Sequence, residues 1–151
     1  MDPYETGKAT GRSPSIKTEV SGQIVVVLDT YRDNRELAMI YPYSRCVRMD
    51  EVHELIMTNE RNAKPGTEVN QVSGIGFMAF QQSGVIMVGD MVRSARLGPL
   101  GRVVGFDVSH YPNHFNIVIY SEERRSGRKC GLELGDEILI DGQFVWDSLV
   151  P

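Results

Sequence analysis

The sequence predicts a mainly β protein: an antiparallel small β-barrel of about eight strands with one short α-helix. Short runs of β-branched and aromatic residues recur along the chain, Gly-, Pro- and Asn-containing turn signals separate them, and only one stretch has a helical pattern. A closed barrel would also remove the edge strands that such a chain otherwise exposes.

A length of 151 residues suits one domain with a hydrophobic core. Residues 1–19 are rich in Gly, Ser, Thr, Pro and Lys and have little to bury, which predicts a flexible N-terminal tail. Residues 20–151 are predicted to form a single β-barrel domain.

The charge and cysteine content narrow the function classes. A net charge of -4 and a pI near 5.4 argue against a nucleic-acid partner. Cys46 and Cys130 lie far apart without a metal-like or redox spacing, which favours a reducing compartment. No apolar run is long enough to span a bilayer and no secretion signal is present, so we expect a cytoplasmic protein without a membrane partner. The oligomeric state stays open, a homo-oligomer included.

The first predicted elements form a hairpin and the helix. Residues 23–29 (QIVVVLD) read as a strand, and residues 36–43 as its hairpin partner. A helix is predicted over residues 50–59, because Asp50 can cap it and apolar residues recur at positions 52, 55 and 56. His53 lies off this stripe, which predicts that it faces solvent.

The remaining elements are strands. Residues 72–80 and 85–93 are predicted to form another hairpin, residues 101–120 a third, and residues 130–146 one or two short strands. An apolar-x-apolar-Gly-Asp-x-apolar pattern occurs at residues 86–92 and again at 132–138, where the Asp carboxylate can cap a tight turn. The repeated Gly-Asp element resembles that of cradle-loop barrels and of barrel domains in translation factors. The stretch around it is also similar to PRC-type adaptor barrels, a resemblance that implies barrel architecture and no function.

The hairpin at residues 101–120 carries the candidate site. Its register follows from placing six apolar side chains on one face, which pairs Val104 with Ile119, Phe106 with Ile117 and Val108 with Phe115. Residues 110–113 then form the loop, and Ser109 faces His114. The opposite face collects Asp107, Ser109, His114 and Asn116, next to His110.

These polar groups predict acid–base chemistry on a polar or anionic small molecule, as in a lyase, isomerase, cyclase or hydrolase. His114 and His110 would act as acid and base, Asp107 would orient His114, and Asn116 and Tyr111 would hydrogen-bond the ligand. No nucleotide loop or cofactor fingerprint appears in the sequence, so no organic cofactor is expected.

Several alternatives stay open. His110, His114 and Asp107 have the composition of a divalent-metal site. A nucleophilic triad could be formed by Ser109, His114 and Asp107, although the sequence shows no oxyanion donor. The barrel could instead be a non-catalytic ligand- or partner-binding module, with Asp107 and Asn116 merely bonded across the hairpin. Four arginines that flank apolar segments could bind an anionic group or pair with surface carboxylates: Arg45, Arg48, Arg93 and Arg96.

Overall fold

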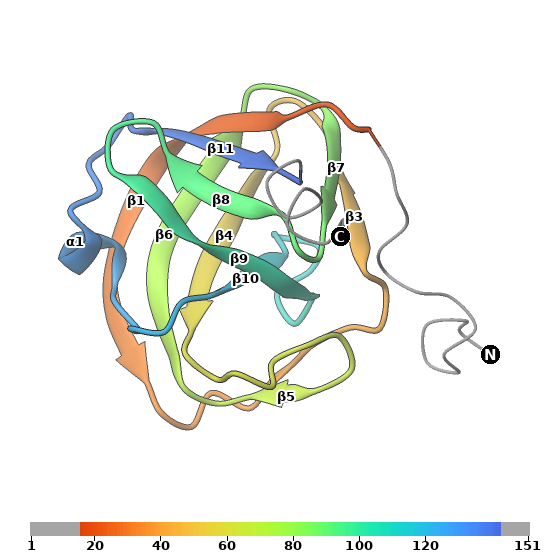
Figure 1. Cartoon of the computed structure of the whole chain (residues 1–151), viewed down its shortest axis with the longest axis vertical. Coiled ribbons are helices and arrows are strands. Elements are labelled where there is room, and N and C mark those ends of the chain that lie inside the picture. The colour runs from red at the N-terminus through yellow and green to blue at the C-terminus, as the bar shows by residue number, and fades with distance from the viewer. Residues whose placement is uncertain (1–15, 143–151) are drawn as a thin grey trace, which may run out of the picture.

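A closed barrel of seven strands forms the centre of the computed structural model, which describes residues 16–142 (Figure 1). Around the barrel the order is β1 (Val20–Arg32), β11 (Glu137–Asp141), β8 (Met91–Ser94), β9 (Gly98–Asp107), β10 (Asn116–Tyr120), β4 (Val52–Thr58) and β6 (Val72–Phe80). Neighbours are antiparallel except β4 and β10, which are parallel. The predicted mainly β barrel is confirmed, with one parallel pair that was not predicted.

Two small sheets and a helix complete the described part of the chain. β2 (Leu37–Ala38) pairs with β5 (Glu68–Val69), and β3 (Ser44–Val47) pairs with β7 (Gly84–Met87). Helix α1 (Gly127–Cys130) packs beside β1 and β6 (Figure 1). It begins after Ser126, whose Oγ accepts a hydrogen bond from the Lys129 N–H at 3.1 Å, as a serine N-cap does.

The helix predicted over residues 50–59 is wrong, because this stretch is strand β4. Asp50 has a φ of 76° and occupies a turn, not a helix cap. The last four residues of β4 are all buried, so the strand is apolar on both faces and its sequence lacks the alternation that identifies a half-buried strand. His53 was expected in solvent and is instead only 6 % exposed.

Two of the three predicted hairpins are wrong, because their strands pair with distant parts of the chain. β1 pairs with β6 and β11, and the short β2 pairs with β5. β6 pairs with β1 and β4, whereas β7 pairs with β3. The third hairpin is confirmed, since β9 and β10 pair directly.

The register of the β9–β10 hairpin is partly as predicted. Phe106 pairs with Ile117, but a bulge follows and Ile119 pairs with Val103, so the predicted Val104–Ile119 pair is wrong. The ladder also ends at Asp107 and Asn116. The connecting loop therefore spans residues 108–115 and is longer than the predicted four residues.

Both Gly-Asp elements are turns, as the sequence predicted. Asp90 Oδ2 accepts a hydrogen bond from the Met87 N–H at 2.9 Å, and Asp136 Oδ2 accepts one from the Glu133 N–H at 2.9 Å. Each Asp follows a glycine with positive φ, Gly89 at 99° and Gly135 at 89°. The two carboxylates therefore cap tight turns.

The ends of the predicted domain are described in part. Residues 1–15 of the predicted tail and residues 143–146 of the last predicted strands lie outside the described residues. Before β1, Lys17 Nζ lies 2.8 Å from Asp90 Oδ2 and Glu19 Oε2 lies 3.3 Å from an Arg93 nitrogen. These contacts fix the last residues before β1 against the barrel.

The barrel has an apolar interior and a second apolar layer on its outer wall. Ile117 of β10 pairs with Leu55 of β4 on one side and with Phe106 of β9 on the other. All three belong to the interior cluster. Ile56 and Val118 point outward and are covered by a cluster that includes residues of β2 and β5. Alternation along the strands then assigns the residues that precede Leu55 and Ile117 to the outer wall.

Candidate functional site

Three polar residues form a row across the outer wall of the barrel. Asn116 of β10 pairs with Glu54 of β4 on one side and with Asp107 of β9 on the other. Asn116 is fully buried and Asp107 is 3 % exposed. The parallel pairing of β4 and β10 thus adds a carboxylate, Glu54, to the predicted polar cluster.

Asp107 is hydrogen-bonded within the hairpin. Its Oδ2 accepts bonds from Asn116 Nδ2 and from the Ser109 hydroxyl, both at 2.7 Å. The Ser109 hydroxyl thus donates to a carboxylate and not to a histidine, so the triad-like arrangement is not formed. The hydrogen bonds of Asp107 also give no support to its predicted role as the residue that orients His114.

His114 faces Glu54. Its Nε2 lies 3.4 Å from Glu54 Oε1, and its Nδ1 lies 2.8 Å from Asn113 Nδ2. An amide N–H group donates, so Nδ1 accepts and Nε2 carries the proton of the neutral ring. The Phe77 and His114 rings are nearly perpendicular, with their centroids 5.0 Å apart. These contacts place His114 Nε2 near the carboxylate without a hydrogen bond between the two groups.

Glu54 is the site residue that sequence reasoning missed. It falls within residues 50–59, the predicted helix, where a carboxylate near the start has a structural explanation because it complements the helix dipole. Burial raises the pKa of Glu54 above its ordinary value of 4.5, and the charge of Asp107 adds to the rise. Electrostatic interactions with His110 and Arg35 lower the pKa of Glu54 in part. The carboxyl group is therefore easier to protonate than an exposed glutamate.

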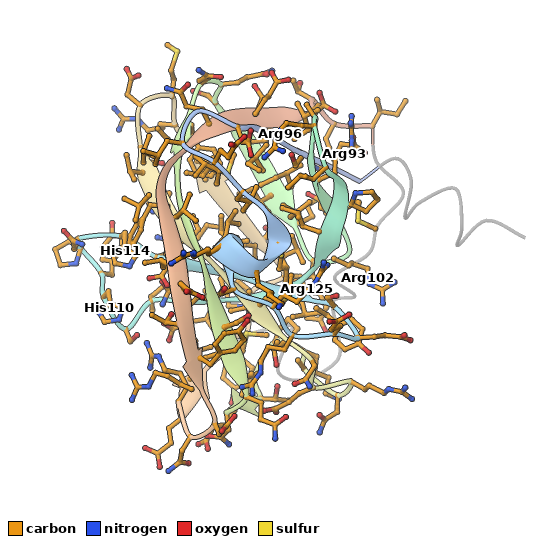
Figure 2. All side chains as sticks on the ribbon, turned by 90° about the vertical axis from the view of Figure 1, so that its left-hand side faces the viewer. Arg93, Arg96, Arg102, His110, His114 and Arg125 are labelled. Atoms are coloured by element: carbon orange, nitrogen blue, oxygen red, sulfur yellow. The ribbon has the colours of Figure 1, made fainter. Side chains whose placement is uncertain are left out.

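His110 closes the cluster on its solvent side. The His110 and His114 rings are stacked, with centroids 5.2 Å apart and an interplanar angle of 23°. Arg35, from the loop after β1, donates to His110 Nε2 at 3.3 Å. Figure 2 shows the two histidines together on one side of the barrel, away from Arg93 and Arg102. The proximity of His110 and His114, expected from the sequence, is thus present in the structure.

Two buried polar atoms of this cluster lack a hydrogen-bond partner in the described part of the chain. They are His114 Nε2 and Asn116 Oδ1. A buried polar atom without a partner costs about 1–3 kcal/mol, so a polar ligand that bonds to such atoms gains that energy. The cluster of Glu54, His110, Asp107, His114 and Asn116 is therefore our candidate site.

Tyr111 lies apart from this cluster. The residue is 61 % exposed, and the guanidinium carbon of Arg45 lies 5.4 Å from the centroid of its ring.

The arginines singled out in the sequence differ from one another in their contacts. Arg93 and Arg96 contact carboxylates, whereas Arg45 lies against aromatic rings.

The predicted metal site gains no support from the geometry. Within residues 16–142, no group of three or more His, Cys, Asp or Glu side chains is placed to hold a metal ion. Cys46 and Cys130 are both free thiols.

The comparisons with known proteins show the family. The model of DUF6917, a family of unknown function, matches residues 14–141. The chain belongs to this family. No curated protein and no solved structure matches it. No helix in the described part of this DUF6917 protein is long and apolar enough to cross a membrane.

Proposed function

We propose that this DUF6917 protein transfers a proton to or from a small, anionic organic molecule, with Glu54 as the base and His114 as its partner. The observation that carries the proposal is the contact between a half-buried carboxylate of raised pKa and the Nε2 of a buried histidine, 3.4 Å apart. Perturbed carboxylates of this kind concentrate at sites of acid–base catalysis.

The raised pKa of Glu54 suits a base that must take up a proton and release it again. Burial penalises the charged carboxylate, which strengthens it as a base towards a substrate proton. The Nε2–H of His114 is a donor beside it. It can hydrogen-bond the oxygen on which negative charge develops when the proton leaves.

Arg35 and His110 favour an anionic substrate. The Arg35 guanidinium is close enough to Glu54 to lower its pKa, and one of its nitrogens lies 3.3 Å from His110 Nε2. A carboxylate of the substrate can replace His110 as the acceptor of that guanidinium. The simplest reaction is removal of a proton from the carbon next to a carbonyl. Glu54 takes the proton, the electron pair of the C–H bond forms a C=C bond, and the π electron pair of the carbonyl moves onto its oxygen.

Hydrogen exchange with solvent tests this proposal without knowledge of the product. A panel of small keto and hydroxy acids is incubated with the protein in D2O, and deuterium at carbon is followed by proton NMR. We expect exchange in at least one acid with the wild type and a loss of about 100-fold or more in Glu54→Gln, the size of a general-base contribution. Glu137→Gln, which changes an exposed carboxylate of β11, is the matched control.

The proposal is overturned if no acid of the panel exchanges, or if Glu54→Gln exchanges as fast as the wild type. A non-catalytic binding module is the second candidate, since the unpartnered Asn116 Oδ1 and His114 Nε2 need only a bound ligand to be satisfied. An acid that shifts the His114 ring signals without exchanging would favour this second function.

A further inference from the structure

Loop 108–115 has a second face, formed by aromatic side chains around an arginine. Arg45 of β3 places its guanidinium carbon 4.5 Å from the centroid of Phe115 and 5.4 Å from that of Tyr111. Such contacts restrict the plane of the guanidinium and are energetically favourable. Arg45 is thereby held in place by the same loop that carries His110 and His114.

Arg45 has no carboxylate beside it in the described residues, unlike several other arginines of the protein. Arg93, Arg96 and Arg124 each lie within an ion-pair distance of an acidic side chain. No such pair involves Arg45 in the described residues, and its buried Nε has no hydrogen-bond partner there. A fixed cation with an unused, desolvated donor is a favourable place for an anion.

His53 supplies a second buried donor next to the same ring. Its ring centroid lies 3.7 Å from that of Phe115, and its Nδ1 accepts a hydrogen bond from the Phe115 N–H at 3.2 Å. In the neutral imidazole the proton must then be on Nε2, which is buried and makes no hydrogen bond in the described part of the chain. The positive charge of Arg45 is close enough to contribute to the lowered pKa of His53, after the larger effect of burial.

One acidic group faces this pair. Glu51 Oε1 lies 3.5 Å from His53 Nε2, and it accepts a hydrogen bond from the Arg48 backbone N–H at 2.7 Å. The same Glu51 oxygen therefore lies near both groups. Glu51 forms no ion pair with Arg45 in the described residues, which leaves the charge of Arg45 available to an incoming anion.

We propose that Arg45 and His53 form a binding site for a compact oxyanion, the carboxylate or phosphate of a small molecule. The site lies on the opposite face of β4 from Glu54, because His53 and Glu54 are successive residues of one strand. The planar guanidinium binds two oxygens of the anion, and the Nε2–H of His53 binds one. The inference does not rest on the proposed function, since anion binding is measured without any reaction.

Titration with inorganic phosphate and, separately, with acetate tests the site. The ring C–H signals of His53 and the Nε–H signal of Arg45 are followed by NMR. We expect saturable shifts with at least one anion; phosphate alone or acetate alone identifies the preferred oxyanion. Arg45→Met should lose about 10-fold or more in affinity, because a charge-assisted bidentate contact is removed.

Arg45→Lys keeps the positive charge and is the variant to measure if Arg45→Met does not fold. It should also bind more weakly, since lysine cannot present two parallel donors. Arg48→Met, which removes an exposed positive charge three residues along the chain, is the matched control and should bind as the wild type does. Absence of saturable shifts in the wild type, or equal affinity in Arg45→Lys, Arg45→Met and the wild type, overturns the inference.

Discussion

Glu54 Oε1 lies 3.4 Å from His114 Nε2, which joins strand β4 to the loop that follows β9. The parallel pairing of β4 with β10 creates this contact, since Glu54 and Asn116 are partners in that register. The Glu54 N–H also donates to the Phe115 carbonyl oxygen at 3.2 Å. The backbone next to both residues is therefore fixed before any ligand binds.

Glu54 should make the free energy of unfolding depend on pH. The pKa of Glu54 is raised above 4.5 in the folded state, so between 4.5 and the raised value the folded protein holds more protons than the unfolded chain. The free energy of unfolding due to this residue therefore falls as pH rises through that range. Glu54→Gln removes the titration, and we expect it to gain stability over the wild type between pH 4 and pH 7, measured by urea unfolding at both pH values.

The control for this prediction is Glu137→Gln, which alters an exposed carboxylate. A pKa difference of one between the folded and unfolded states corresponds to about 1.4 kcal/mol of stability, which is large enough to be measured by urea unfolding. An unchanged pH dependence in Glu54→Gln would contradict the raised pKa.

The barrel class could be predicted because most of its strands keep recognisable β patterns and turn signals. The Asp107–Asn116 pair could be predicted too, since apolar alternation in β9 and β10 sets the register near the loop. The bulge beyond this pair could not be predicted, because Val104 also packs against the apolar cluster on the outer wall.

Glu54 escaped prediction for two physical reasons. β4 is buried on both faces over most of its length, so its apolar residues fit a helical stripe as well as a strand. Its pairing with β10 also joins segments far apart in the chain, and nothing in either segment alone specifies a partner. The site therefore needed the fold to reveal its carboxylate.

His53 predicts a second pH effect of opposite sign. Burial lowers the pKa of His53 below 6.5, so between the lowered value and 6.5 the unfolded chain holds more protons than the folded protein. Stability due to His53 is complete above pH 6.5 and falls as pH drops below it. His53→Gln, whose amide oxygen can accept the Phe115 N–H bond, should reduce the loss of stability between pH 7.5 and pH 5. An equal loss in variant and wild type would refute this assignment.

Asp107 should stabilise the hairpin. Asp107→Ala leaves the buried amide of Asn116 without its acceptor and should lower the free energy of unfolding by about 1–3 kcal/mol. Ser109→Ala removes a donor and leaves the Asn116 bond in place, so its cost should be smaller. Thermal or urea unfolding of the two variants compares them, and equal costs would contradict the central place of Asp107 in the network.

The packing of helix α1 on β6 can be tested at Gly127. A Cβ atom at this position would overlap the carbonyl oxygen of Ile75, which belongs to the backbone and cannot turn away. Gly127→Ala should therefore cost about 1–3 kcal/mol of stability by overpacking. Arg128→Ala, on the exposed side of the same helix, should stay within about 0.5 kcal/mol of the wild type. Urea unfolding that finds no difference between these variants would contradict the close approach of α1.

The ionisation of Glu54 tests the account most directly. The side-chain carboxyl carbon of Glu54, labelled with carbon-13, is followed by NMR as pH is raised, together with the ring nitrogens of His114. We expect a Glu54 midpoint above 4.5 and a change in the His114 signals at that same midpoint. A Glu54 midpoint at or below 4.5 would contradict the proposed acid–base pair. His114 signals that do not change at the Glu54 midpoint would contradict it as well.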